Sequence, residues 1–242
     1  MNCKNLLLLL LAGFLAAGCA TTRLAEGEYR LAGNKVKVEG KKVSSSELTP
    51  YITQKANNSL LGIRKPGTPP VIHNASQVQA SMDNMVSHLE YIGYYGSKVT
   101  SDVQYKKNKA YVTYHVFPGK QYTIRSIDFE LPEDEEFRAE FEADRSRITV
   151  KEGQFLSESS LEAEAERSAE FFRNRGYYGF DKTYYFCEAD TLSHDGTAAL
   201  VMAIRNYARH DSPENAKPHR KFTIGNVTLS YPKEIPIRSY VL

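Results

Sequence analysis

Gly93-Tyr94-Tyr95-Gly96 occurs a second time as Gly176-Tyr177-Tyr178-Gly179, and both copies occupy the same place in a larger repeated pattern. Each copy ends a helical stretch whose first apolar anchor, Val78 or Leu161, lies equally far before the first glycine. Two strand-like runs follow each copy. Because self-similarity along a chain indicates one supersecondary unit used more than once, we predict two copies of one α+β unit over most of this sequence.

A second repeated segment, of the form aromatic-Thr-Ile, begins a new unit each time. It reads Tyr122-Thr123-Ile124 in the middle of the chain and Phe222-Thr223-Ile224 near its end. The apolar alternation changes phase between Ile124 and Ile127, which indicates either a β-bulge in this strand or a residue that serves the junction with the preceding unit. A single such strand cannot complete a unit, so the second segment predicts the start of an incomplete third one.

The order of elements is predicted to be strand, helix, helix, strand, strand. In the first unit, Asn34 to Gly40 alternates like a short strand, and Ser44 with Glu47 forms a capping-box pattern. Asn74 is the expected N-cap of a longer helix that ends at Gly93, where a left-handed residue is favoured. A hairpin that turns at residues 107–109 completes the unit.

The second unit repeats this order. Residues 127–131 give the strand, Pro132 opens a helix, and Ser157 is the expected N-cap of the helix that ends at Gly176. The hairpin is expected over residues 180–189 and 198–204. The polar stretch that follows predicts a linker in which His210 and His219 are solvated.

The resulting domain organisation has six parts. They are a signal peptide at 1–18, a tether at 19–33, a first domain at 34–119, a second at 120–207, a linker at 208–219, and the first strand of an incomplete third domain at 220–242.

The N-terminus predicts export and a lipid anchor. Lys4 precedes an apolar run that reaches Ala17, and this run is shorter than the roughly 20 residues that a membrane-spanning helix needs. The segment Leu15-Ala16-Ala17-Gly18-Cys19 resembles a bacterial lipobox, which implies lipid attachment at Cys19. The alternative is an ordinary signal peptide cleaved near Ala20. No aspartate follows Cys19, and the resemblance therefore implies an outer-membrane anchor that faces the periplasm.

Composition excludes several classes of function. Cys3 leaves with the signal and Cys19 would carry lipid, so Cys187 is the one cysteine of the folded part and an intrachain disulfide is impossible. The formal net charge is +2, with basic and acidic residues interspersed, which gives no electrostatic basis for binding nucleic acid. The six histidines lack metal-ligand spacing, and no nucleophile motif or phosphate loop is present. We therefore predict neither an enzyme nor a bound metal or cofactor.

Strand-helix-helix-strand-strand units with Gly-Tyr-Tyr after the second helix resemble polypeptide-transport-associated (POTRA) repeats. The run Lys151-Glu152-Gly153-Gln154-Phe155 before that helix strengthens the likeness, which covers roughly residues 34–232. The lipobox together with residues 67–72 is similar to the lipoprotein branch, TamL, of the BamA/TamA superfamily. The resemblance implies elongated tandem α+β domains, each with a three-stranded mixed sheet backed by two helices. It also implies a role in outer-membrane protein assembly.

Such a sheet leaves an edge whose unpaired N–H and C=O groups accept another strand. The resemblance implies that the second strand of each unit is this edge. The expected client-binding residues are Lys98, Val99, Thr100, Ser101, Asp102, Val103 and Gln104 in the first unit, and Lys182, Thr183, Tyr184, Tyr185, Phe186 and Cys187 in the second. A simple spacer role is the alternative. The Gly-Tyr-Tyr-Gly residues are expected to serve packing.

The implied partners are unfolded outer-membrane β-barrel proteins and other subunits of the assembly machinery, such as a TamB-like protein anchored in the inner membrane. Contact with the membrane would pass through the acyl anchor. A different class remains open, in which the chain is a surface or periplasmic lipoprotein that acts as an adhesin or glycan binder.

Overall fold

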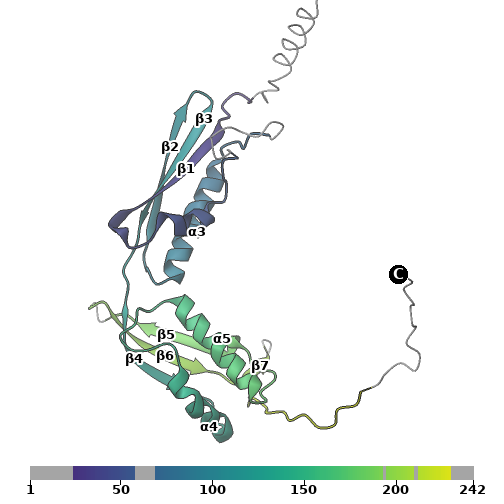
Figure 1. The fold of residues 1–242 in the computed structure, drawn as a ribbon. Coiled ribbons are helices and arrows are strands. Elements are labelled where there is room, and N and C mark those ends of the chain that lie inside the picture. The colour runs from purple at the N-terminus through teal and green to yellow at the C-terminus, as the bar shows by residue number, and fades with distance from the viewer. Residues whose placement is uncertain (1–23, 58–68, 193–194, 210–211, 230–242) are drawn as a thin grey trace, which may run out of the picture. The chain divides into compact units, whose positions relative to one another are not determined.

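The computed structural model describes residues 24–57, 69–192, 195–209 and 212–229 (Figure 1). The chain divides into two compact units between Gln121 and Tyr122. None of the helices in these ranges is both long enough and apolar enough to cross a membrane. Cys19 and the proposed signal peptide lie outside the described residues.

The first unit consists of one sheet and a helical layer. Its elements are β1 (Arg30–Val38), η1 (Glu39–Lys41), α2 (Ser45–Leu48), η2 (Thr49–Tyr51), α3 (Ala75–Tyr91), β2 (Lys98–Lys106) and β3 (Lys109–Phe117). The sheet has the order β1-β3-β2, with β1 parallel and β2 antiparallel to the central strand β3.

The second unit repeats this topology. Its elements are β4 (Thr123–Glu130), α4 (Glu135–Asp144), η3 (Arg145–Arg147), α5 (Glu158–Asn174), η4 (Lys182–Tyr184), β5 (Tyr185–Asp190) and β6 (Thr197–Ile204), followed by β7 (Tyr207–Arg209) and β8 (Ser212–Lys217). The sheet order β4-β6-β5 is again mixed, with β4 parallel to β6. The predicted α+β fold class with two three-stranded mixed sheets is confirmed.

Local sequence signals set the ends of the long helices. Asn74 accepts hydrogen bonds from the backbone of Ser76 and Gln77 at the start of α3, and Ser157 accepts one from Ser160 N–H at the start of α5. Gly93 and Gly176 have φ angles of 94° and 99° just past the helix ends. Only glycine adopts this region at little cost, so the repeated motif stops both helices.

The β-bulge predicted in β4 is confirmed by a register shift between Ile124 and Ser126. β1 has the same shift between Leu31 and Gly33, so the two first strands are equivalent. β1 begins at Arg30, so residues 30–33, which were expected in the tether, belong to the first strand. The bulge interrupts the apolar alternation and so concealed the start of this strand.

Each unit has its own apolar core. Leu31, Leu48, Met85 and Leu89 of the first unit are at most 1% exposed. In the second unit the core is aromatic, and the rings of Phe137 and Phe172 stack with centroids 4.3 Å apart. Because each core closes around its own sheet, the two units are separate domains.

The predicted polar linker at 208–219 is wrong in part, because β7 and β8 pair as an antiparallel ribbon. Residues 218–229 have no regular secondary structure, so the strand expected there is not formed within the described part of the chain. In both complete units the first strand pairs with the second strand of the hairpin, and residues 220–229 have no such partner among the described residues. The third domain stays a prediction.

Candidate functional site: the open sheet edges

The outer edge of β2 presents unpaired backbone groups. Lys106 and Lys109 pair across a two-residue turn and must therefore exchange direct hydrogen bonds, since the turn leaves no other pairing geometry. Alternate residues of β2 then point their N–H and C=O groups away from β3, which places those of Val99, Ser101 and Val103 on the outer edge. No other described segment of the first unit hydrogen-bonds to this edge.

The opposite edge of each sheet is partly closed by the segment that precedes the long helix. In the first unit, Leu31 N–H donates to Val71 O at 2.8 Å and His73 N–H donates to Tyr29 O at 2.8 Å. In the second unit the corresponding bonds run from Ile124 to Gln154 and from Leu156 to Tyr122, also at 2.8 Å. This repeated closure leaves β2 and β5 as the edges at which a strand can add over its full length.

The expected edge strand of the second unit is displaced along the chain. Lys182, Thr183 and Tyr184 form the 3-10 turn η4, so the expectation that they belong to the strand is wrong. Asp181 caps this turn by accepting from Thr183 N–H, and the Lys182 ammonium lies 2.7 Å from a carboxylate oxygen of Glu162 on α5. The open strand is Tyr185–Asp190, which contains only the last three of the expected residues.

The side chains on the two edges differ. In β2, Val99 and Val103 pack against the core while Lys98, Thr100, Asp102 and Gln104 are exposed. In β5 only Tyr185 is half-buried, and the remaining residues of the strand are exposed. The second edge is therefore the less covered of the two.

Cys187 lies on the helix-facing side of β5, two residues from Tyr185, although its side chain as a whole is exposed. Burial raises the pKa of its thiol to about 11. The thiol is therefore protonated at neutral pH and is a poor nucleophile, because the thiolate is the reactive form.

The Gly-Tyr-Tyr-Gly motif supports each sheet from the end of its long helix. In the first unit the backbone of Tyr95 pairs with Lys120 through two hydrogen bonds of 2.9 and 3.0 Å. Gly119 lies so close to this motif that an added Cβ would be 2.0 Å from Tyr95 O. In the second unit Tyr177 is 2% exposed and Tyr178 is 82% exposed. One tyrosine is therefore a core residue there, as expected for a packing motif.

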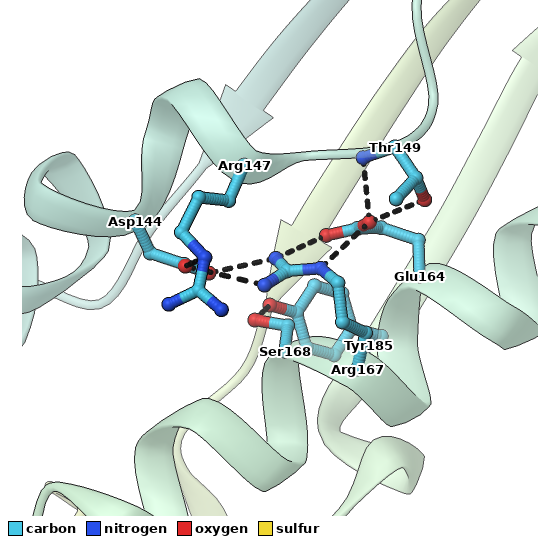
Figure 2. A network of polar contacts seen from close by, with 7 residues as sticks. All are labelled: Asp144, Arg147, Thr149, Glu164, Arg167, Ser168 and Tyr185. Carbon is cyan, nitrogen blue, oxygen red and sulfur yellow. Dashed lines mark hydrogen bonds and ion pairs between the residues drawn. The ribbon is translucent and has the colours of Figure 1, made fainter.

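A buried polar network joins α4, α5 and β5 in the second unit (Figure 2). The Arg167 guanidinium donates to Asp144 Oδ2 and to Glu164 Oε1, both at 2.7 Å, and these carboxylate side chains are 3% and 2% exposed. Hydrogen bonding to Glu164, with Asp144 adding to it, raises the pKa of Arg167. The Arg167 guanidinium therefore stays charged.

A separate hydrogen bond beside this network holds the start of the β5 edge. Ser168 of α5 hydrogen-bonds the hydroxyl of Tyr185, and burial raises the pKa of that tyrosine above its usual value. Tyr185 is the first residue of β5. This hydrogen bond thereby holds one end of the open strand against α5.

Glu164 has an equivalent in the first unit that the sequence analysis missed. Glu164 Oε2 accepts from Thr149 N–H at 2.8 Å, and Ser81 Oγ accepts from Thr53 N–H at 3.0 Å. Ser81 and Glu164 lie equally far before the first glycine of the repeated motif. The repeated pairs Ile52-Thr53 and Ile148-Thr149 were a signal that could have revealed this contact.

His219 was expected to be solvated and is instead packed against the second unit. Its ring centroid lies 4.8 Å from that of Phe180 and 4.7 Å from that of Tyr184, and its Nε2 is 2.9 Å from Arg205 O. Phe222 N–H then donates to Gly176 O at 2.7 Å. Residues 219–222 are thus docked on the motif. His210 lies outside the described residues.

Docking of residues 219–222 is expected to weaken as the pH falls below about 6.5. Burial lowers the pKa of His219, which outweighs the raising effects of the Arg205 carbonyl and Asp134. The docked state holds the neutral His219 ring. Docking is therefore most stable above the pKa that His219 has when undocked, and it weakens at lower pH because the undocked form takes up a proton. We expect exchange of the Phe222 amide, corrected for its intrinsic rate, to accelerate up to about tenfold between about pH 7.5 and 5.5. In a His219→Phe variant the corrected rate should be independent of pH, and the same acceleration there would contradict the assignment.

Each unit is thus an α+β module in which helices pack on a three-stranded sheet, one edge is partly closed, and the edge formed by the second strand is open. The family model for POTRA, described as "Surface antigen variable number repeat", matches residues 34–119. The first unit therefore matches the POTRA family model over most of its length, and the second unit has the same strand order, bulge and edge closure.

Several solved structures align with the chain at low identity. POTRA3-5 of Haemophilus influenzae BamA is 18% identical, with 75% of this chain and 68% of that chain covered and a TM-score of 0.40. POTRA1-2 of the periplasmic domain of Omp85 from Anabaena is 12% identical, with 75% and 98% covered and a TM-score of 0.34. BamA from Haemophilus ducreyi is 18% identical, with 73% and 29% covered and a TM-score of 0.40. No curated protein sequence matched the chain.

Proposed function

We propose that the chain is the POTRA module of an outer-membrane protein assembly or translocation factor and binds extended segments of unfolded β-barrel clients. The observation that carries the proposal is the open outer edge of β2, where Val99, Ser101 and Val103 direct backbone groups outward. An extended peptide that adds to this edge gains main-chain hydrogen bonds whatever its side chains are. Tolerance of client sequence is what a general assembly factor needs.

The β5 edge, Tyr185–Asp190, is proposed as a second site of the same kind. Lys98 and Lys106 on β2 also fit a protective role, because charged residues on an edge prevent uncontrolled pairing between copies of the same protein. Assembly partners, including a TamB-like subunit, are proposed to use the same edges or the remaining surface.

The proposed location is the periplasmic face of the outer membrane, with a lipid anchor at Cys19 as in TamL-type lipoproteins. The support for this part is the sequence of residues 15–19 and the absence of an aspartate after the cysteine. The POTRA assignment of residues 34–119 supports the same location.

Replacing Ser101 by proline is expected to weaken client binding at least tenfold. The Ser101 N–H points away from β3, so proline removes an outward donor and obstructs an added strand without breaking the β2–β3 ladder. The probe is a labelled peptide of about ten residues with the alternating pattern of an outer-membrane strand, and binding is measured by fluorescence anisotropy. Cys187→Pro is the corresponding variant in β5, since Cys187 pairs with Met202 as Ser101 pairs with Tyr114.

Ser101→Ala and Cys187→Ala are the matched controls, because they remove the same side chains and keep the N–H groups. Both should bind the peptide as the unmodified chain does. Proline variants that fold and bind as tightly as these alanine variants would exclude strand addition at both edges. That outcome would favour the role of a spacer.

A further inference from the structure

The sheet of the first unit has a face without helices, on which positive charge accumulates. Val36, Val38, Val99 and Val103 pack into the core on the helical side, so the residues that alternate with them lie on the other side. Five exposed lysines from all three strands share that side, namely Lys35, Lys37, Lys98, Lys106 and Lys109. We name this set the lysine face.

The described residues of the first unit do not neutralise the charge of the lysine face. Asp102 is the single acidic residue of the three strands that form this sheet. In the described part of the chain none of the five lysines forms an ion pair with a carboxylate. Exposed aromatic rings accompany the lysines on the central strand, since Tyr111 is 37% and Phe117 is 44% exposed.

The corresponding face of the second unit has the opposite charge. Phe129 packs on Phe141 of α4, so Asp128 and Glu130 lie on the side away from the helices. Glu188 and Asp190 join them from β5. Among the described residues of this face, basic groups lie only near its ends, where Arg125 bonds to Thr197 and Arg205 stacks over Phe186. Two units with one fold therefore present faces of opposite sign, and the shared fold does not explain the lysine face.

We infer that the lysine face binds the phosphate headgroups of an anionic lipid surface. The strands that carry it extend over roughly 30 Å, so the ammonium groups are spread across a flat sheet instead of converging on one point. Lysine is a compact point charge suited to a diffuse anionic surface, whereas arginine is preferred for paired recognition of single carboxylates. Tyrosine and phenylalanine beside the lysines suit the interface between headgroups and water.

The position of the face along the chain agrees with this occupant. If Cys19 is acylated, a part of the inference that rests on the proposed function, the chain between Cys19 and Arg30 spans at most about 40 Å when fully extended. The first unit is then held near the bilayer surface. Each lysine near an anionic surface strengthens binding about fivefold.

The test uses the full chain carrying Cys19→Ala, so that no acyl chain contributes to binding. Partition is measured by co-sedimentation with vesicles of phosphatidylcholine that contain phosphatidylglycerol, and with vesicles of phosphatidylcholine alone. The ratio of the two partition coefficients isolates the anionic contribution, because the N-terminal apolar run is common to all variants. We expect the ratio to exceed unity clearly and to fall as the salt concentration rises.

The decisive variant is Lys35→Gln, Lys37→Gln and Lys109→Gln combined, which leaves both open edges unchanged. Its matched control is Lys42→Gln, Lys55→Gln and Lys120→Gln, which removes the same charge from exposed positions outside the lysine face. We expect the ratio to fall up to about 100-fold in the first variant and little in the control. The inference would be overturned if the ratio of partition coefficients in the first variant were less than about fivefold below that in the control variant.

Two further measurements separate this inference from the proposed function. Peptide binding at β2 and β5 should be the same in both lysine variants, and incorporation of labelled fatty acid into unmodified Cys19 reports the anchor independently. An acidic protein partner would replace the lipid under two conditions. The chain would bind soluble poly-glutamate and lose that affinity in the Lys35, Lys37 and Lys109 variant, and it would partition equally into the two kinds of vesicle. Circular dichroism should be identical for all variants, since the substituted lysines are exposed and unpaired.

Discussion

Replacing Arg167 by alanine is expected to lower the free energy of unfolding of the second unit by about 3–5 kcal/mol. Arg167 is the shared partner of Asp144 and Glu164, whose side chains are 3% and 2% exposed (Figure 2). Removal of the guanidinium leaves Glu164 without an ion-pair partner among the described residues and leaves Asp144 with only the longer, exposed pair to Arg147 at 3.7 Å. The desolvation of the two buried carboxylates is then largely uncompensated. Urea unfolding followed by circular dichroism measures the change, and hydrogen exchange of α5 assigns it to the second unit.

Arg145→Ala is the matched control for this prediction. Arg145 also pairs with a carboxylate at 2.7 Å, but its side chain and that of Glu142 are 51% and 53% exposed. Water and salt screen such a pair, and the Arg145 guanidinium also lies 5.1 Å from the centroid of the Phe129 ring, so the loss of both contacts should cost no more than about 2 kcal/mol. Equal losses in the two variants would show that burial of the network contributes nothing.

The Arg167 variant also has an expected consequence for the candidate site. Arg167 precedes Ser168, which anchors Tyr185 at the start of β5, whereas β2 belongs to the other unit. Loosening of the network should therefore increase amide exchange in Tyr185–Asp190 and leave β2 unchanged. An equal increase in both strands would contradict the separation of the two cores.

Tyr177→Ala is expected to be as damaging, with a loss of about 3–5 kcal/mol in the second unit. The ring is 2% exposed and meets Phe137 and Phe172 edge to face at centroid distances of 5.5 and 5.7 Å. Alanine would leave a cavity in an aromatic core that cannot collapse around it. The measurement is again the urea unfolding transition of the second unit.

Two neighbouring substitutions test whether burial of the ring is the cause. Tyr178 is 82% exposed, so Tyr178→Ala should change stability by no more than about 0.5 kcal/mol. The buried Tyr177 hydroxyl has no hydrogen-bond partner among the described residues, so Tyr177→Phe should be neutral or stabilising. A large loss in either variant would argue that the motif acts through a polar contact or through its exposed ring.

The sequence predicted the repeated unit, its order of elements and both long helices correctly. These features depend on neighbours within a turn or a strand, such as the Asn74 and Ser157 caps and the glycines at 93 and 176. The same local reasoning failed for Lys182–Tyr184, where aromatic residues favoured a strand but the Asp181 cap and the contact of Lys182 with Glu162 stabilise a turn.

Other features depend on segments distant in the sequence, and no local pattern reports them. His219 packs against Phe137, which lies far earlier in the chain, and a polar stretch was therefore taken for solvated linker. The closure of β1 by residues 71–73 and of β4 by residues 154–156 is equally non-local. That closure leaves β2 and β5 as the open edges, which the family resemblance implied but which no local pattern of residues shows.

The sequence by itself determined that this protein is built from repeated α+β units, because caps, glycines and apolar alternation are read over a few neighbouring residues. The tertiary structure alone decided which backbone groups remain unpaired, which charges are buried together around Arg167, and which lysines share one face of a sheet. The physical reason is that hydrogen-bond pairing, desolvation and the sign of a surface are properties of groups brought together by folding, and their separation along the chain does not encode them.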